Sequence, residues 1–177
     1  PDNTVHLRFI VPTPGLLGFR YQFMTITRGT GVLNTIFHDY LQYCGPIISR
    51  ASSSIVAWET GQSTTFGLKN AEERGVLFIG AGVDVYEGMV VGETQRPDDL
   101  TVNICKKKHL TNMRSSNKDI EIRLTPPQQM SLDQAIEYLN EDELLEVTPT
   151  NFRIRKKILN TEERGKQTKK AKELLQE

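Results

Sequence analysis

Long apolar runs are missing from this sequence. No stretch approaches the roughly 18 consecutive apolar residues of a membrane span, and no signal-peptide pattern opens the chain, so we expect no membrane partner. The first residue is Pro1 instead of Met, and residues 5–11 already have the pattern of a strand. We therefore expect a fragment of a longer protein.

Cysteine and histidine are scarce. The two cysteines, Cys44 and Cys105, and the three histidines match no metal-ligand or redox spacing, which argues against a metal site. Free thiols fit a reducing compartment such as the cytoplasm, and a disulfide between the two cysteines is the less favoured alternative.

Net charge is absent as well, because 22 basic residues balance 22 acidic ones. The charges are nevertheless segregated along the chain. Residues 102–117 contain no acidic side chain, the charged residues of 126–150 are all acidic, and those of 151–172 are mostly basic. Such asymmetry is typical of a protein that contacts nucleic acid.

The basic segment within residues 100–127 carries the strongest binding signal. Clustered cations attract a polyanion, and interleaved amides and hydroxyls can hydrogen-bond to phosphate, ribose or bases. A solvated loop without a partner is the alternative. The candidate nucleic-acid-binding residues are Lys106, Lys107, Lys108, His109, Thr111, Asn112, Arg114 and Lys118, and a secondary basic patch is predicted at Arg153, Arg155, Lys156 and Lys157.

The first 43 residues predict a strand, a helix and a second strand. Apolar residues alternate over 5–11, recur at helical spacing over 16–26 before Gly29, and return in a strand pattern over 35–40. This unit is too small to bury both of its faces, so we expect it to need partners that the sequence does not contain.

From Cys44 onward the pattern becomes rich in β-structure. Short apolar runs at 54–59, 76–79, 83–86 and 89–92, separated by glycines, predict a compact antiparallel barrel or sandwich. A short helix is predicted at 64–73, and a second begins at Ser131, where Ser131 and Gln134 form a capping box. Its apolar face is predicted to be Leu132, Ala135, Ile136 and Leu139. A closing hairpin around 148–149 and a polar tail from 161, either frayed helix or disordered, complete an α+β chain.

Catalytic patterns are weak. Residues 61–69 have two glycines and a lysine, but five residues separate the glycines and Leu68 stands where a phosphate-binding loop needs lysine. Cys44 lies near His38 in the sequence, which alone does not make a nucleophile and base pair. The acidic pair Glu72 and Glu73, and the acidic residues of 140–143, are explained by solvated helix ends. We predict no catalytic residues here.

Several motifs together resemble one protein family. They are GFRYQFMTITRGTG from Gly18, ERGVLFIGAGVDVYEGMVVGE from Glu73, HLTNMR in the basic loop, and LTPPQQMSLDQAIEYLNEDELLEVTP from Leu124. In this order they resemble the C-terminal portion of the TypA/BipA family of translational GTPases. The resemblance implies that residues 1–43 are the second half of a ferredoxin-like domain shared with elongation factor G. Residues 44–160 would form the family's barrel-like C-terminal domain, and 161–177 a basic tail.

The resemblance also implies a function. Such a factor binds the ribosome, in the cytoplasm or an organelle stroma, and serves translation under stress and large-subunit assembly. Its basic loop, here residues 102–118, would reach large-subunit ribosomal RNA and the acceptor end of the aminoacyl-site transfer RNA. GTP and magnesium are expected for the parent protein, with no cofactor in this fragment, which we expect to be monomeric. The loop departs from the family pattern at Ile104, Cys105, His109 and Ser115. The competing hypothesis is a protein-interaction or structural domain that makes no RNA contact.

Overall fold

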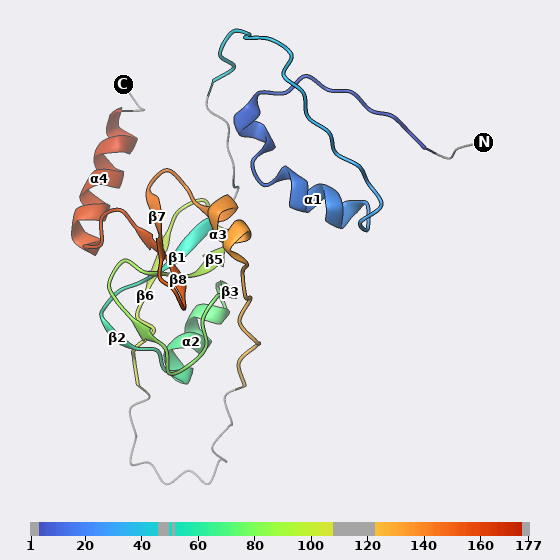
Figure 1. Cartoon of the computed structure of the whole chain (residues 1–177). Coiled ribbons are helices and arrows are strands. Elements are labelled where there is room, and N and C mark those ends of the chain that lie inside the picture. The colour runs from blue at the N-terminus through green and yellow to red at the C-terminus, as the bar shows by residue number, and fades with distance from the viewer. Residues whose placement is uncertain (1–3, 46–49, 51, 108–122, 175–177) are drawn as a thin grey trace. The chain divides into compact units, whose positions relative to one another are not determined.

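A computed structural model describes residues 4–45, 50, 52–107 and 123–174. The chain divides into two compact units, Pro1–Ser49 and Arg50–Glu177 (Figure 1). Unit 1 contains the 3₁₀-helix η1 (Thr13–Leu16) and the helix α1 (Phe19–Ile26). The predicted helix is thus present, and it ends in a left-handed turn in which Gly29, with a φ of 79°, donates its N–H to the Met24 carbonyl at 2.8 Å.

The two strands predicted for unit 1 are wrong for this chain. Residues 4–11 and 30–45 run without strand pairing in the part of unit 1 that the structure describes. Their apolar side chains are exposed, among them Val5 at 79%, Phe9 at 77% and Ile36 at 92%. A strand needs a neighbour to accept its backbone hydrogen bonds and cover its apolar face, and these segments have no such neighbour in the described chain. The ferredoxin-like arrangement is therefore not formed by these residues alone.

Unit 2 is built around a four-stranded mixed sheet with the order β3-β5-β1-β6. Its strands are β1 (Ser53–Ala57), β3 (Gly75–Leu77), β5 (Val90–Thr94) and β6 (Leu100–Val102). The β1–β5 and β3–β5 pairs are antiparallel, whereas β1 and β6 are parallel. The described strands leave β3 and β6 as edges, so the predicted antiparallel barrel does not close.

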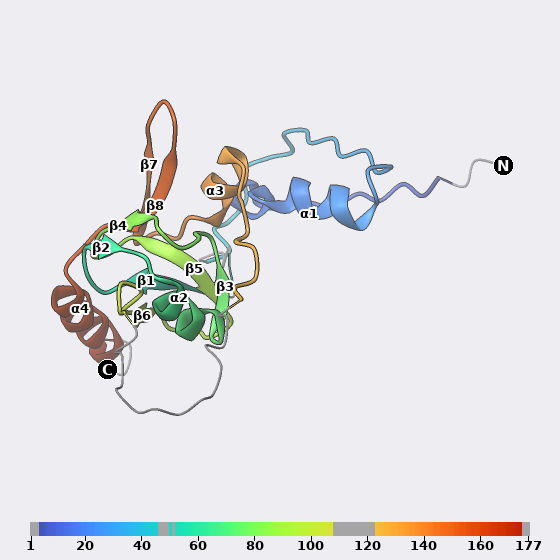
Figure 2. The ribbon, with the colours of Figure 1, turned by 90° about the horizontal axis from the view of Figure 1, so that it is seen from below.

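Two smaller antiparallel pairs accompany this sheet. One joins β2 (Gly61–Gln62) to β4 (Asp84–Val85), and the other joins β7 (Glu143–Val147) to β8 (Phe152–Lys156). Figure 2 shows the β7–β8 hairpin extending away from the four-stranded sheet. Strand β8 of the hairpin contacts strand β5 of the sheet. The hairpin confirms the prediction made around residues 148–149.

The described residues of unit 2 also form three helices, α2 (Thr65–Glu72), α3 (Leu132–Tyr138) and α4 (Thr161–Leu174). The first packs against β3 (Figure 1). The last is a polar helix whose described side chains are mostly exposed. The predicted capping box of α3 is present, since Ser131 accepts from the Gln134 N–H and Gln134 accepts from the Ser131 N–H. Its predicted apolar face is only partly buried, because Leu132 and Ile136 are 43% and 54% exposed.

The core lies on both faces of β1. All five residues of this strand are buried, as expected for a central strand that is covered on both sides. The larger cluster joins Ile55 and Ala57 to Leu68 and Ala71 of α2 and to Ile104 beyond β6. A smaller cluster joins Val90 to Ala135 and Ile154. Among the residues described, no helix is long and apolar enough to cross a membrane.

Candidate nucleic-acid interface

The described part of the basic loop begins directly after β6. Ile104 is buried in the core, and the chain then turns outward, so that Lys106 and Lys107 are exposed. The amide oxygen of Asn103 accepts the Cys105 N–H at 3.0 Å and shapes this turn. The other predicted RNA-binding residues lie outside the described residues, namely Lys108, His109, Thr111, Asn112, Arg114 and Lys118.

Helix α2 holds the two ends of this loop. Thr64, its N-cap, donates its hydroxyl to the Lys106 carbonyl at 2.5 Å. Glu72, its last residue, accepts the Thr125 N–H at 2.5 Å on the returning segment. Residues 64–69 belong to the 61–69 segment that superficially resembles a phosphate loop, and here the Thr64 hydroxyl and the Lys69 ammonium are engaged by the chain itself. The backbone at both ends of the basic loop is therefore held by hydrogen bonds to α2, next to the exposed Lys106 and Lys107.

The secondary basic patch does not form as predicted. Lys156 is 1% exposed, and Arg155 forms an ion pair with Glu146 at 2.7 Å. A cation that is buried among carboxylates cannot reach a phosphate without first giving up those partners. Of the four predicted residues, Lys157 is exposed and Arg153 half-buried, so only these two keep a cation available at the surface.

Lys156 is instead the centre of a buried charge cluster. Its ammonium lies 2.5 Å from Asp99, 2.8 Å from Asp142 and 2.9 Å from Glu143. Burial lowers the pKa of Lys156, but Glu143 and the other two carboxylates outweigh burial, so that the pKa is raised. Arg50 joins the cluster from the other side, with its guanidinium 3.2 Å from Glu143 and 3.9 Å from the centre of the Tyr138 ring.

Glu143 was expected at a solvated helix end, and this expectation is wrong. Its side chain is fully buried and accepts the Ser54 hydroxyl at 2.5 Å. A signal for this burial was present in the sequence. Glu143 lies two residues before Leu145, and Lys156 lies two residues after Ile154, so the period of two along a strand places each charge on the same face as an apolar residue. The role of Arg50 had no comparable signal, because it precedes β1.

The candidate catalytic groups do not come together in the described residues. Cys44 and His38 are both exposed in unit 1, and Cys105 is a half-buried free thiol whose pKa is raised by burial and by the charge of Glu59. In the described ranges, no group of three or more His, Cys, Asp or Glu side chains could hold a metal ion. Glu72 and Glu73 also differ, since Glu72 is tied to Thr125 while Glu73 is exposed.

These observations define an α+β domain that presents lysines from a loop anchored at both ends. The family described as the TypA/BipA C-terminal domain matches residues 52–161, and this chain belongs to the TypA/BipA family. It is similar to the putative elongation factor TypA-like SVR3, chloroplastic, of Arabidopsis thaliana, with 52% identity over 153 residues that cover 86% of this chain and 22% of the relative.

Bacterial relatives show the same pattern. The chain is 46% identical over 172 residues to the large ribosomal subunit assembly factor BipA of Bacillus subtilis, which covers 97% of this chain and 28% of the relative. It is 43% identical over 176 residues to the protein of the same name from Salmonella typhimurium, and the match covers 98% of this chain and 29% of the relative. The chain thus spans less than a third of the length of these relatives.

Proposed function

We propose that this chain is the ribosome-binding and RNA-contacting C-terminal module of a translational GTPase. The observation that carries the proposal is the anchored basic loop of a domain whose bacterial relatives are named large ribosomal subunit assembly factors. Assembly of a ribosomal subunit places a factor against ribosomal RNA. Loops that are rich in lysine and free of acidic residues suit such a surface, because they neutralise phosphates and release counterions.

The loop would contact large-subunit ribosomal RNA and the acceptor end of the aminoacyl-site transfer RNA. In this proposal Lys106, Lys107 and Lys108 neutralise phosphates, and Asn112 hydrogen-bonds to a base or ribose. Arg114 has the leading role, since its planar guanidinium binds phosphate through two hydrogen bonds or stacks on a base, as lysine cannot. His109, Thr111 and Lys118 would add further polar contacts.

The remaining parts of the chain have proposed roles as well. Residues 1–43 would complete a ferredoxin-like domain together with an earlier part of the parent protein, residues 44–160 would form the RNA-binding domain, and the tail 161–177 would add electrostatic attraction. GTP hydrolysis with magnesium belongs, in this proposal, to a separate domain of the parent. The parent would act in the cytoplasm, or in the stroma of an organelle as the name of the Arabidopsis relative suggests.

A salt series tests the proposal. Binding of the full chain to isolated large ribosomal subunits is measured between low and physiological salt, for the wild type and for a variant with Lys106, Lys107, Lys108 and Arg114 all replaced by Ala. Each lost phosphate contact should reduce the slope of log K against log salt by about 0.7–0.9. Arg20→Ala, an exposed position on α1, is the control and should leave the slope unchanged.

The alternative predicts a different result. If the domain instead docks on a protein and the loop has no partner, the quadruple variant keeps the wild-type affinity and the wild-type salt slope. That outcome would end the RNA-binding proposal. In the expected case, Asn112→Ala weakens binding equally at all salt concentrations, because a neutral side chain releases no counterion.

A further inference from the structure

Helix α2 spans the base of the basic loop and contacts both of its ends. From this geometry we propose that α2 positions the loop for RNA, with Thr64 and Glu72 as positioning residues. The inference rests on the proposed function, which it deepens by naming two residues outside the loop. Neither side chain touches RNA in this proposal, and each acts through the backbone of the loop.

The incoming end is held by the N-terminus of α2. The Thr64 hydroxyl accepts the Gly67 N–H at 3.0 Å and donates to the Lys106 carbonyl at 2.5 Å, and the Thr64 N–H donates to the Ile104 carbonyl at 2.9 Å. A Cβ at Gly67 would clash with the Ile104 carbonyl oxygen. The backbone of residues 104–106 is therefore fixed against the first turn of the helix.

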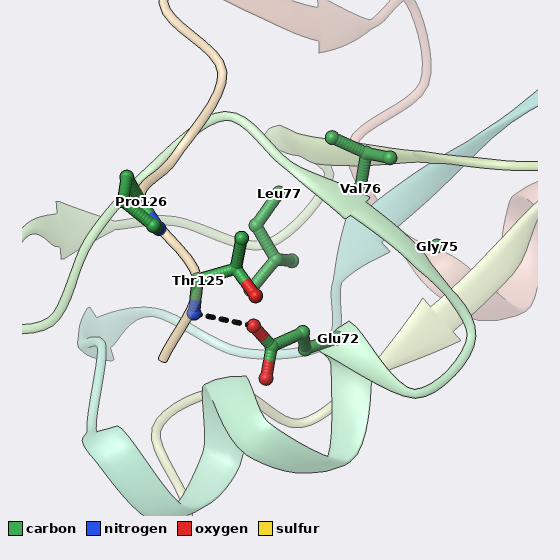
Figure 3. Close-up of a pocket in the computed structure, with 6 residues that line it drawn as sticks. All are labelled: Glu72, Gly75, Val76, Leu77, Thr125 and Pro126. Atoms are coloured by element: carbon green, nitrogen blue, oxygen red, sulfur yellow. Dashed lines mark hydrogen bonds between the residues drawn. The ribbon is translucent and has the colours of Figure 1, made fainter. Parts of the chain in front are cut away.

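The outgoing end is held by the C-terminus of the same helix. Figure 3 shows the hydrogen bond that the Thr125 N–H donates to the Glu72 carboxylate, and the Thr125 nitrogen lies 2.5 Å from Oε1 of Glu72. The second carboxylate oxygen lies 2.7 Å from the Lys69 ammonium. The hydrogen bonds from Lys69 and Thr125 lower the pKa of Glu72 to about 2, so the carboxylate stays ionised at neutral pH. Three residues later, Gln128 donates its N–H to the Leu77 carbonyl of β3 at 2.8 Å.

The small pocket beside this contact is not a ligand site. It measures about 180 Å³, and the carboxylate that faces it already holds Lys69 and Thr125. The other lining side chains are apolar except Thr125, so little is left to recognise a polar ligand. The pocket is lined by Glu72, Gly75, Val76, Leu77, Thr125 and Pro126 (Figure 3).

Fixing both ends of a loop reduces the conformations that it must lose on binding. The entropy of closing a flexible loop depends on where its ends are held, and a pre-organised loop binds with a smaller ordering cost. Release of Thr125 from Glu72 would free the outgoing end while leaving every loop cation in place. Affinity for RNA should then fall without a change in the number of phosphates contacted.

Electrostatics alone predicts the opposite effect, which makes the test decisive. Removing a carboxylate near a site that binds a polyanion should strengthen binding slightly. Glu72→Ala should nevertheless weaken binding of the full chain to isolated large ribosomal subunits by about three- to tenfold, the cost of ordering about one more flexible group. The salt slope should stay at the wild-type value, and the Thr125 amide should exchange its hydrogen faster while that of Ile55 in β1 does not.

Glu73→Ala is the matched control, because it removes the same charge from an exposed neighbouring position. Glu72→Gln retains an oxygen for the Thr125 N–H and should restore most of the affinity. Thr64→Val, which loses the hydroxyl at nearly constant volume, should weaken binding in the same manner as Glu72→Ala. These three variants separate positioning from charge and from general loss of structure.

Several outcomes would overturn the inference. Equal affinities of Glu72→Ala and Glu73→Ala would show that the contact to Thr125 does not matter, as would a Glu72→Gln variant as weak as Glu72→Ala. The proposed function survives either result if the quadruple variant of Lys106, Lys107, Lys108 and Arg114 to Ala still weakens binding and flattens the salt slope. If that quadruple variant binds like the wild type, the proposed function fails and the positioning role fails with it.

Discussion

Replacing Lys156 by Met should strongly destabilise unit 2. The side chain of Lys156 is 2% exposed and neutralises three carboxylates, of which Asp99 is 33% exposed and Asp142 is 61% exposed. Water can therefore solvate these two after the substitution. Glu143 cannot be solvated in this way, because its side chain is fully buried. It contacts two cations, and the substitution would remove the nearer one, Lys156, and leave only Arg50.

The magnitude follows from this difference. Removing one partner of a buried ion pair costs about 3–5 kcal/mol, because the other charge stays buried without compensation. The contact from Arg50 to Glu143 at 3.2 Å persists, which puts the expected loss of unfolding free energy near the lower end, at about 3 kcal/mol. With a urea m-value of about 2 kcal/mol/M, the unfolding midpoint should fall by about 1.5 M.

Urea unfolding at pH 7, followed by far-ultraviolet circular dichroism, provides the assay. Lys157→Met is the control, because this exposed residue, which directly follows β8, should change stability by less than about 0.5 kcal/mol. The double variant of Lys156→Met with Glu143→Gln should lose less than the sum of the two single variants, since each removes the charge that the other leaves unpaired. A loss below about 1 kcal/mol for Lys156→Met would show that Glu143 does not need the charge of Lys156 in the folded state.

The same cluster predicts a shift in pH dependence. Burial would raise the pKa of Glu143, but Lys156, the Ser54 hydroxyl and Arg50 outweigh burial and lower it. A carboxyl with a lowered pKa in the folded state contributes stability at pH values above its unfolded pKa, and this contribution is lost as the pH falls through the folded value. Without Lys156 the pKa of Glu143 in the folded state rises toward its unfolded value, so the part of the stability that acid removes through Glu143 should be smaller than in the wild type.

Three further predictions concern other parts of unit 2. Ile55→Ala, in the fully buried centre of β1, should cost about 2–5 kcal/mol in urea unfolding, and a cost near zero would contradict its place in the core. The pKa of Glu72 is about 2, against an ordinary value of 4.5, so its carboxylate should contribute stability that is lost as the pH falls from about 4.5 to 2. The urea unfolding midpoint of Glu72→Gln should therefore vary less over that pH range than the midpoints of the wild type and of Glu73→Gln. Truncation after Asn160 should shift the thermal midpoint by only a few degrees, because α4 has few apolar residues and its described side chains are mostly exposed, although Thr161 donates its N–H to Glu87 at 2.7 Å. A large drop would show that α4 is packed.

Elements with a local signal could be predicted from the sequence. The capping box at Ser131, the helix before Gly29 and the turn between β7 and β8 each depend on residues a few positions apart. The strands expected in unit 1 failed for the opposite reason. Alternation over residues 5–11 describes a surface that suits a sheet, but hydrogen bonds to a neighbouring strand decide whether the sheet forms.

The site was predictable only in part. The exposed positions of Lys106 and Lys107 follow from a run of cations after an apolar strand. The position of Lys156 two residues after Ile154 indicates that it is buried, but its partners could not be predicted, because three carboxylates from two separate segments must meet around it. The same holds for Glu72, whose contact with Thr125 joins residues that are far apart in the sequence. The order of charges along the sequence does not show which of these distant residues contact each other in the fold.

The order in which the sheet is assembled has a consequence for how this domain is made. The central strand β1 comes first in unit 2, yet its partners come much later, since Ser53 pairs with Thr94 and Ile55 with Leu100. Long-range pairing of this kind slows folding, to roughly milliseconds to seconds for sheets dominated by it. On the ribosome that synthesises it, an emerging chain would carry the apolar strand β1 uncovered until residues 100–102 had left the exit tunnel. This interval is when the chain is most exposed to aggregation and to capture by chaperones.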